Sequence, residues 1–158
     1  MSKGSRLKQK MAQSGLVHVM AAHSALSARL AEEAGFDAIW ASGFELSALH
    51  GLPDVSLITM TEHLQTMRSM AEQMSLPIVA DIDTGFGNAV NVVHAIRHYE
   101  RAGAAAVVIE DKTFPKVTSL VAGGRQELLR VEEFRARSRR LARPERIRIS
   151  WSSRGSRR

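Results

Sequence analysis

Acidic residues follow three apolar runs of this sequence, at positions where carboxylates can bind a metal ion. Asp81 and Asp83 come directly after one run, and Glu110 comes directly after another. Asp54 lies in the loop that follows a third run. Carboxylate oxygens are hard ligands that suit Mg²⁺ or Mn²⁺ bound largely through waters. Any one of these acids alone would be a helix cap or a structural ion pair, but together they predict a metal site.

A short polar and glycine-containing segment follows the same run that precedes Asp54. It consists of Ser42, Gly43 and Phe44, and its backbone amides could form a pocket for an oxyanion. An ordinary turn is an equally good interpretation of these three residues. Glycines also stand at positions 85 and 87, where the chain could turn tightly or approach a ligand closely.

The elements that must position these residues alternate between strand-like and helix-like patterns. Apolar, β-prone runs cover 17–21, 38–41, 77–80 and 105–109, and amphipathic patterns cover 24–34, 61–74, 89–102 and a segment from about 130. Strands that are apolar throughout are buried on both faces, and their alternation with helices predicts a parallel sheet. No G-x-G-x-x-G motif follows any run, which favours a barrel over a doubly wound sheet. A (β/α)₈ barrel needs eight such units. The four present here predict an α/β fold that is the N-terminal half of a barrel.

Composition and charge exclude several classes of protein. The sequence has no cysteine, so disulfides, thiolate metal sites and cysteine nucleophiles are excluded. The apolar stretch 16–22 is too short to span a membrane, so a soluble, cytoplasmic protein is expected. The net charge is +6, but residues 1–134 carry 12 Lys and Arg against 15 Asp and Glu. The last 24 residues carry ten arginines against one acid, so a nucleic-acid partner is not expected for the body of the chain.

Three sequence runs resemble the phosphoenolpyruvate mutase/isocitrate lyase superfamily over roughly residues 5–134. They are the IWASGFE run at 39–45, the DIDTGFGN run at 81–88 and the IEDKTFPK run at 109–116. The resemblance implies a (β/α)₈ barrel in a homo-oligomer with a swapped last helix. It also implies Mg²⁺, with Mn²⁺ or Co²⁺ as substitutes, and an α-keto acid or its enolate bound at the barrel mouth.

The resemblance also implies roles for individual residues. Asp81 would be the direct metal ligand, and residues 112 to about 126 would be a gating loop. Within that loop Lys116 would reach the phosphoryl group of the substrate. The waters of the ion would be held by Asp54, Asp83 and Glu110. The substrate would contact Trp40, Ser42, Gly43 and Phe44.

Two features of the gating loop indicate which branch of the superfamily the sequence resembles. Carbon–carbon lyases of this superfamily have a loop cysteine, and this chain has none. Phosphoenolpyruvate mutases have asparagine two residues after the loop lysine, whereas this chain has Thr118, which is similar to the phosphonopyruvate-hydrolysing branch. The implied reaction is hydrolysis of the carbon–phosphorus bond of phosphonopyruvate to pyruvate and phosphate, with Lys116 and Thr118 as catalytic residues. A mutase or a related carboxylic-acid lyase is the alternative enzyme.

The arginine-rich residues 135–158 depart from the superfamily pattern. A basic arm that binds nucleic acid, in a non-enzymatic fragment, is one interpretation, and a disordered end is another. The favoured hypothesis is a lost reading frame, because a shifted frame permits a turn and an apolar strand over 142–158 and a helix over 136–140. We therefore expect a partial barrel over 1–134 followed by a disordered, non-native tail. The chain as written is expected to be poorly soluble and inactive.

Overall fold

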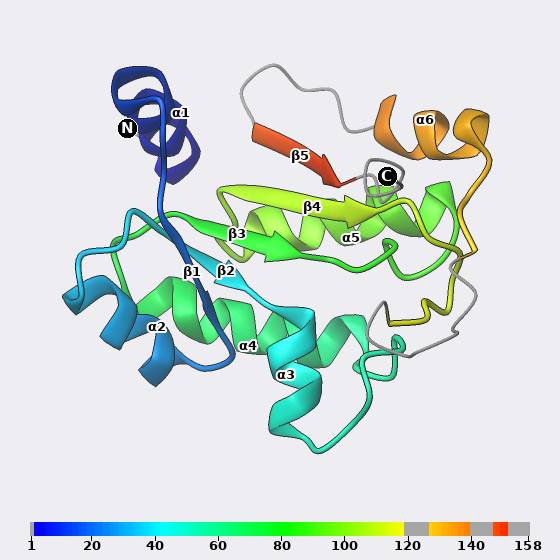
Figure 1. Cartoon of the computed structure of the whole chain (residues 1–158), viewed down its shortest axis with the longest axis horizontal. Coiled ribbons are helices and arrows are strands. Elements are labelled where there is room, and N and C mark those ends of the chain that lie inside the picture. Colours follow the sequence, from blue (N-terminus) through cyan, green and yellow to red (C-terminus); the bar gives the residue numbers. More distant parts are fainter. Residues whose placement is uncertain (1, 119–126, 140–146, 152–158) are drawn as a thin grey trace, which may run out of the picture.

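The computed structural model describes residues 2–118, 127–139 and 147–151, and its centre is a parallel sheet. Five strands pair in the order β1-β2-β3-β4-β5, which is also their order in the chain. The arrows of β3, β4 and β5 point the same way in Figure 1, so their carboxyl ends lie at one edge of the sheet. The strands are β1 (Val19–Ala22), β2 (Ala38–Ala41), β3 (Ile78–Asp81), β4 (Ala106–Glu110) and β5 (Ile147–Trp151).

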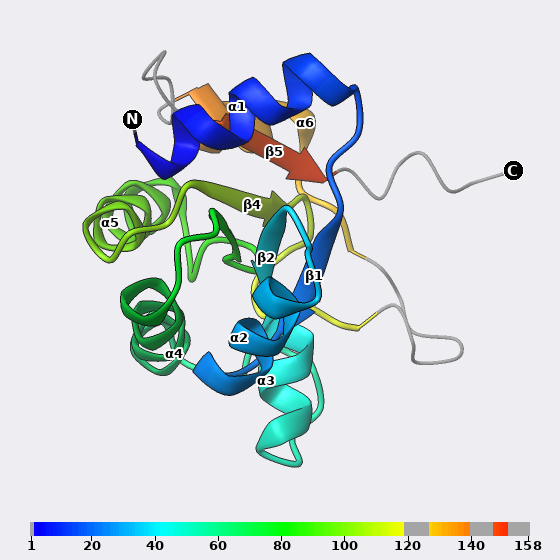
Figure 2. The ribbon, with the colours of Figure 1, turned by 90° about the vertical axis from the view of Figure 1, so that its left-hand side faces the viewer.

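Helices cover both faces of the sheet, and one face holds most of the core. The larger buried cluster joins one face of the sheet to α2, α4 and α5, with Met67, Ile78 and Tyr99 fully buried. The smaller cluster joins Leu7 of α1 to Val79 and Val108 on the opposite face. Figure 2 shows α1 and the α2–α4–α5 group on opposite sides of the strands. The helices are α1 (Lys3–Ser14), α2 (Ala25–Glu33), α3 (Gly43–Leu49), α4 (Met60–Gln73), α5 (Ala89–Arg101) and α6 (Val131–Arg139).

Side-chain caps start the three helices that pack on the larger core. Ser24, Thr59 and Asn88 each accept a hydrogen bond from a backbone N–H in the first turn of the helix that follows. Such a cap contributes about 1 kcal/mol to helix stability, because it satisfies a donor that has no partner within the helix. Two of these helices are followed by a glycine with positive φ, Gly35 at 86° and Gly103 at 99°. The chain can therefore reverse immediately and enter the next strand.

The predicted α/β fold with four βα units is confirmed, and three elements were not predicted. These are α1, α3 and β5. Helix α3 is only seven residues long, and its sequence shows too few turns for a helical period to be recognised. Strand β5 (IRISW) pairs with β4 over five residues and alternates apolar and polar residues, a pattern typical of a strand. It was not predicted because it lies within the arginine-rich segment 135–158, for which a disordered tail was expected.

The predicted boundary at residue 134 falls inside α6, which continues to Arg139. Two parts of the predicted tail, 135–139 and 147–151, have regular structure, and the division of the chain into a barrel part and a non-native tail stays a prediction. Residues 140–146 and 152–158 lie outside the described residues. Among the described helices, none is long and apolar enough to cross a bilayer.

Candidate metal centre

The predicted acidic residues meet at the carboxyl edge of the sheet. Asp81 is the last residue of β3, Asp83 follows it in the loop, and Glu110 is the last residue of β4. One carboxylate oxygen from each of the three lies within 4.8 Å of the others. Asp81 is only 8% exposed, as is Asp83, so the cluster faces inward rather than into bulk water.

The side chain of Lys116 brings the fourth predicted acid to this cluster. Its Nζ lies 2.6 Å from Asp83 Oδ1, 3.0 Å from Asp54 Oδ2 and 3.2 Å from Glu110 Oε1. The lysine is buried, and its own backbone N–H donates to Ser56 Oγ at 3.1 Å. The structure therefore brings Asp54, Asp81, Asp83 and Glu110 together around one ammonium group.

Burial and the charges of neighbouring groups shift the pKa values of Asp81, Asp54 and Lys116. Burial and the nearby Asp83 carboxylate raise the pKa of Asp81 to about 7. Burial also raises the pKa of Asp54, although the Lys116 ammonium opposes the shift. For Lys116, burial alone would lower the pKa, but the charges of Asp83, Glu110 and Asp81 outweigh burial and raise it.

A divalent cation fits this donor set. Oxygens of Asp81, Asp83 and Glu110 lie within 4.8 Å of one another, and the Lys116 ammonium connects Asp54 to this group. Lys112 supplies a second positive charge, with its Nζ 3.0 Å from Glu110 Oε2. Oxygen donors of this kind suit Mg²⁺, which keeps several of its waters. The three acids whose oxygens lie together would offer such an ion a direct ligand and acceptors for its waters.

The backbone after β3 makes an unusual turn that presents Asp83 to the cluster. Asp83 has a φ of 50°, a left-handed conformation that costs about 1 kcal/mol for a residue with a side chain. Its carbonyl accepts a hydrogen bond from Glu110 N at 2.7 Å, and Gly85 N donates to Ile82 O at 2.8 Å. Gly85 has a φ of 90°, and a Cβ there would collide with Val92.

The predicted substrate-binding residues lie beside the acids at the end of β2. Ala41 pairs with Ala80, which places Ser42 level with Asp81 at the edge of the sheet. Ser42 is buried, and its hydroxyl caps α3 by accepting from Glu45 N at 3.1 Å. A Cβ on Gly43 would lie 3.2 Å from Asp83 Oδ1, so only glycine leaves the carboxylate undisturbed.

Phe44 and Trp40 flank this segment in different environments. Phe44 is 47% exposed, in the first turn of α3, whereas Trp40 is half-buried in β2 and packs against the smaller core cluster. The amides of Gly43 and Phe44 lie in a first helical turn, where backbone N–H groups have no acceptor within the helix. The role of Trp40, Ser42, Gly43 and Phe44 in substrate binding stays a prediction.

The two ends of the predicted gating loop are held together in the structure. Thr113 N donates to Glu127 O at 3.0 Å, and Leu129 N donates to Asp111 O at 2.8 Å. Residues 119–126 of the loop lie outside the described residues. Thr118 is the last described residue before them, and its catalytic role stays a prediction.

Three residues near the site were missed by sequence reasoning. Lys112 pairs with Glu110, as described above. His63 of α4 is buried, and its Nε2–H donates to Ala41 O at 3.2 Å while its Nδ1 accepts from the Tyr99 hydroxyl at 2.8 Å. A signal for His63 existed, because it shares the apolar stripe of α4 with Met67 and Met70. The third, Arg137 of α6, had no signal, because ten arginines crowd residues 135–158.

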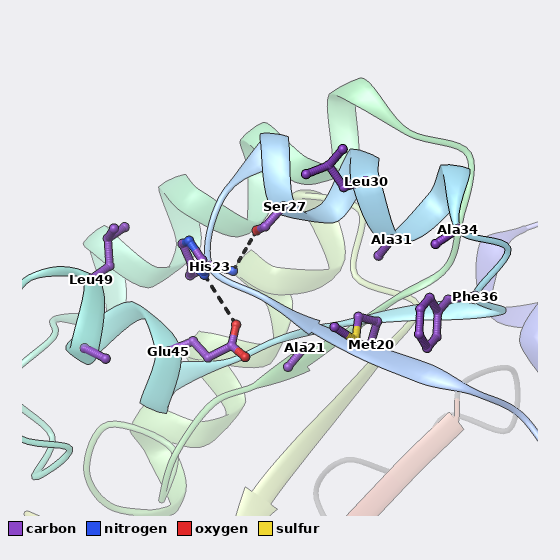
Figure 3. A pocket seen from close by; sticks show the side chains of 11 residues that line it. Met20, Ala21, His23, Ser27, Leu30, Ala31, Ala34, Phe36, Glu45 and Leu49 are labelled. Atoms are coloured by element: carbon purple, nitrogen blue, oxygen red, sulfur yellow. Dashed lines mark hydrogen bonds and ion pairs between the residues drawn. The ribbon is translucent and has the colours of Figure 1, made fainter.

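A separate apolar groove lies on the outer side of the open β1 edge, away from the acids. Figure 3 shows side chains of β1, α2, α3 and the loop after α2 around it, including Met20, Leu30, Phe36 and Leu49. Its volume is about 660 Å³, and two of its lining residues are joined by a hydrogen bond between His23 Nδ1 and Glu45 Oε2 at 3.4 Å. None of the predicted metal-binding or catalytic residues lines this groove.

Comparison with known proteins identifies the family to which this chain is similar. A model of the phosphoenolpyruvate phosphomutase family matches residues 7–148. The phosphonopyruvate hydrolase of Variovorax sp. (strain Pal2) is 54% identical over 137 residues, which cover 87% of this chain and 47% of the relative. The chain thus spans about half the length of that relative.

Solved structures agree with this result. A phosphoenolpyruvate phosphomutase from Streptomyces platensis subsp. rosaceus is 49% identical with a TM-score of 0.89, and the match covers 94% of this chain and 53% of that one. A phosphonopyruvate hydrolase complex with oxalate and Mg²⁺ is 47% identical with a TM-score of 0.84, covering 96% of this chain and 53% of that one. The described sheet corresponds to about half of the barrel of these enzymes. The chain therefore belongs to the phosphoenolpyruvate phosphomutase family of enzymes.

Proposed function

We propose that the acidic edge binds Mg²⁺ and that this chain carries the metal-binding half of a phosphonopyruvate hydrolase. The observation that carries the proposal is the buried carboxylate cluster around Lys116. The similarity to the Variovorax phosphonopyruvate hydrolase supports the substrate, and the similarity to a hydrolase complex with oxalate and Mg²⁺ supports the metal. The reaction would convert phosphonopyruvate and water to pyruvate and phosphate.

Asp81 would hold the ion directly, and Asp54, Asp83 and Glu110 would accept hydrogen bonds from its waters. Mg²⁺ would supply a Lewis acid that stabilises the enolate of pyruvate. The pyruvyl part of the substrate would lie against Trp40 and Phe44, with the amides of Gly43 and Phe44 donating to its oxygens.

The bond changes assign tasks to the two loop residues. Water oxygen forms a bond to phosphorus while the carbon–phosphorus bond breaks, and the bonding electrons remain on the enolate, which a proton then converts to pyruvate. The Lys116 ammonium would offset charge on the phosphoryl group as it transfers. Thr118 would orient the attacking water through its hydroxyl.

Phosphate release from phosphonopyruvate tests the proposal on the 158-residue chain and on the same chain supplemented with the second half of the Variovorax relative. We expect Mg²⁺-dependent release in the supplemented sample, with loss of release on adding a chelator or on Asp81→Asn. A supplemented sample that folds, binds Mg²⁺ and still releases no phosphate would contradict hydrolysis.

A phosphoenolpyruvate mutase is the second candidate, and the TM-score of 0.89 to such an enzyme favours it. Phosphorus NMR separates the two, because a hydrolase yields inorganic phosphate and a mutase yields phosphoenolpyruvate. Thr118→Asn probes the boundary. In the sample supplemented with the second half of the Variovorax relative, we expect the unmodified chain to yield phosphate and the Thr118→Asn chain to yield less of it.

A further inference from the structure

Arg137 of α6 is a buried arginine that contacts the loop carrying Asp83. It is 4% exposed, although its neighbours Arg135 and Ala136 on the same helix are exposed. Its Nη1 donates to the carbonyl of Thr84 at 2.9 Å. Its Nη2 lies 2.7 Å from Glu133 Oε1, one turn earlier in α6. A charged group is rarely buried without such partners, so the Thr84 carbonyl is a specific contact.

The contact acts on the backbone one residue after a carboxylate of the proposed metal site. Asp83 and Thr84 are consecutive, and each of their carbonyls accepts one hydrogen bond from a different element. Glu110 of β4 donates to Asp83 O, and Arg137 of α6 donates to Thr84 O. The two hydrogen bonds hold the peptide planes on both sides of Thr84, and so restrict the backbone that follows Asp83.

The loop needs this support because its conformation is not the one its residues prefer. Asp83 has a φ of 50°, a region that residues with a side chain rarely adopt unless surrounding contacts hold them there. Thr84 is fully buried, so water cannot replace the arginine as donor to its carbonyl. Glu133 keeps the guanidinium in place by pairing with the nitrogen that does not contact Thr84.

We propose that Arg137 is a positioning residue for the metal centre, which holds Asp83 in its metal-binding orientation through the Thr84 carbonyl. The inference rests on the proposed function, since it concerns the same carboxylates. It also places α6, up to Arg139, with the catalytic body rather than with a separate tail.

The first experiment measures Mn²⁺ affinity of the 158-residue chain by electron paramagnetic resonance titration. Arg137→Met should weaken Mn²⁺ binding about tenfold or more, the usual loss for a residue that orients a metal ligand. Arg137→Lys should recover much of this affinity, since an ammonium can still donate to the carbonyl. Arg135→Met, which removes an exposed arginine from the same helix, is the control and should bind as the unmodified chain does. Equal affinity of Arg137→Met and Arg135→Met overturns the proposal.

A second measurement separates this inference from the metal proposal. Amide hydrogen exchange of the segment 81–88, without metal, should become faster in Arg137→Met and not in Arg135→Met. If the unmodified chain binds no Mn²⁺, the metal site fails, and exchange alone decides the role of Arg137. Unchanged exchange in Arg137→Met overturns it. Should Arg137→Met fail to fold, Glu133→Gln can replace it, because this change releases the guanidinium from its carboxylate partner. Glu133→Gln should speed exchange of segment 81–88 by a smaller amount. Unchanged exchange in Glu133→Gln would then count against the role of Arg137.

Discussion

At the scale of single residues, the proposed metal site is governed by the balance between four carboxylates and the Lys116 ammonium. Burial removes water that would otherwise stabilise each charge, so the carboxylates repel one another more strongly than they would at a surface. The raised pKa of Asp81 is the direct result. Protonation, Lys116 and a divalent cation are therefore three competing ways to neutralise the same oxygens.

Divalent-ion affinity should depend on pH through Asp81. The pKa of this carboxyl in the fold is raised from 3.8 to about 7, so below pH 7 the ion must displace a proton. We expect affinity to fall about tenfold for each pH unit below 7 and to level off above it. Calorimetric Mn²⁺ titrations between pH 5.5 and 8 would measure the slope, with Glu72→Gln on α4 as a control. A flat profile would contradict the assignment of Asp81.

The same shift predicts how the metal-free fold responds to pH. The folded state binds the Asp81 proton more tightly than the unfolded state, so this group lowers stability as pH rises from about 4 to 7. Asp81→Asn removes the carboxylate and should remove this part of the pH dependence. Denaturant unfolding of both proteins without metal, at several pH values, checks the sign.

Replacing Lys116 should make the stability of the fold depend more strongly on a bound metal ion. In Lys116→Met the carboxylates of Asp54, Asp83 and Glu110 lose their shared partner, so the metal-free protein should unfold at lower temperature. Added Mg²⁺ should raise the unfolding temperature more in this variant than in the unmodified chain. Lys10→Met, which breaks the more exposed pair with Asp37, is the control and should show little change. An equal response to Mg²⁺ in all three proteins would argue against a shared site.

Single residues also show what sequence reasoning could reach. The acids at strand ends were predictable, because a strand that ends at a carboxylate places it at the edge of a parallel sheet. The ammonium at their centre was not predictable as a structural partner, because Lys116 is 62 residues from Asp54 in the chain and its reach depends on how the loop folds. Arg137 was hidden for another reason, because nothing in the sequence distinguishes it from the other nine arginines of residues 135–158.

At the scale of elements, the four apolar runs were good predictors of strands. The run 77–80 became β3 at Ile78–Asp81, and the run 105–109 became β4 at Ala106–Glu110. Boundaries moved by one residue because hydrogen-bond register with the neighbouring strand, not apolarity, decides where pairing ends. Helix α4 begins at Met60 with Thr59 as its cap, slightly before the predicted start at Thr61.

One hydrogen-bonded chain ties α4 and α5 to the end of β2 and should matter for stability. Tyr99 of α5 donates to His63 of α4, which donates to Ala41 O. His63→Phe leaves both partners buried without a hydrogen bond, at an expected cost of about 1–3 kcal/mol for such groups. Denaturant unfolding should show this loss, whereas His94→Phe on the exposed side of α5 should cost less. Equal losses would contradict the importance of the chain.

Burial lowers the pKa of His63 and outweighs the opposing effect of the Ala41 carbonyl. A lowered pKa means that the contribution of His63 to stability is complete above its unfolded value of about 6.5 and is lost as pH falls through the folded value. His63→Phe should therefore be less sensitive to mild acid than the unmodified chain, although less stable at neutral pH.

At the scale of the whole molecule, the sheet has an unpaired edge at β1 among the described strands. Met20, Leu30 and Leu49 are exposed around the groove beside it. An open parallel edge next to an apolar groove favours association. We expect the 158-residue chain to form concentration-dependent oligomers in analytical ultracentrifugation, and Leu30→Glu to reduce them. A chain that stays monomeric at high concentration would refute this expectation.

The hypothesis of a lost reading frame over residues 135–158 stays a prediction. Strand β5, in the printed frame, pairs with β4 at the place where a fifth βα unit would start. In the shifted frame, an apolar strand would start only about two residues after the start of β5. Sequencing the gene across codons 130–158 and beyond decides the matter. Further βα units in the shifted frame would support a lost frame, and their absence would leave the arginine-rich segment as the true continuation.

The strands occupy the sheet in the order in which the ribosome makes them. Each new βα unit can therefore add to an edge that already exists, and no strand has to insert between two others. The acids emerge during this process, and Lys116 follows the last of them by six residues. At typical translation rates of ~5–20 residues per second, that gap lasts about a second or less. The nascent chain thus provides a counter-ion for its acidic edge almost at once, so folding during synthesis does not have to wait for metal, and loading can follow afterwards.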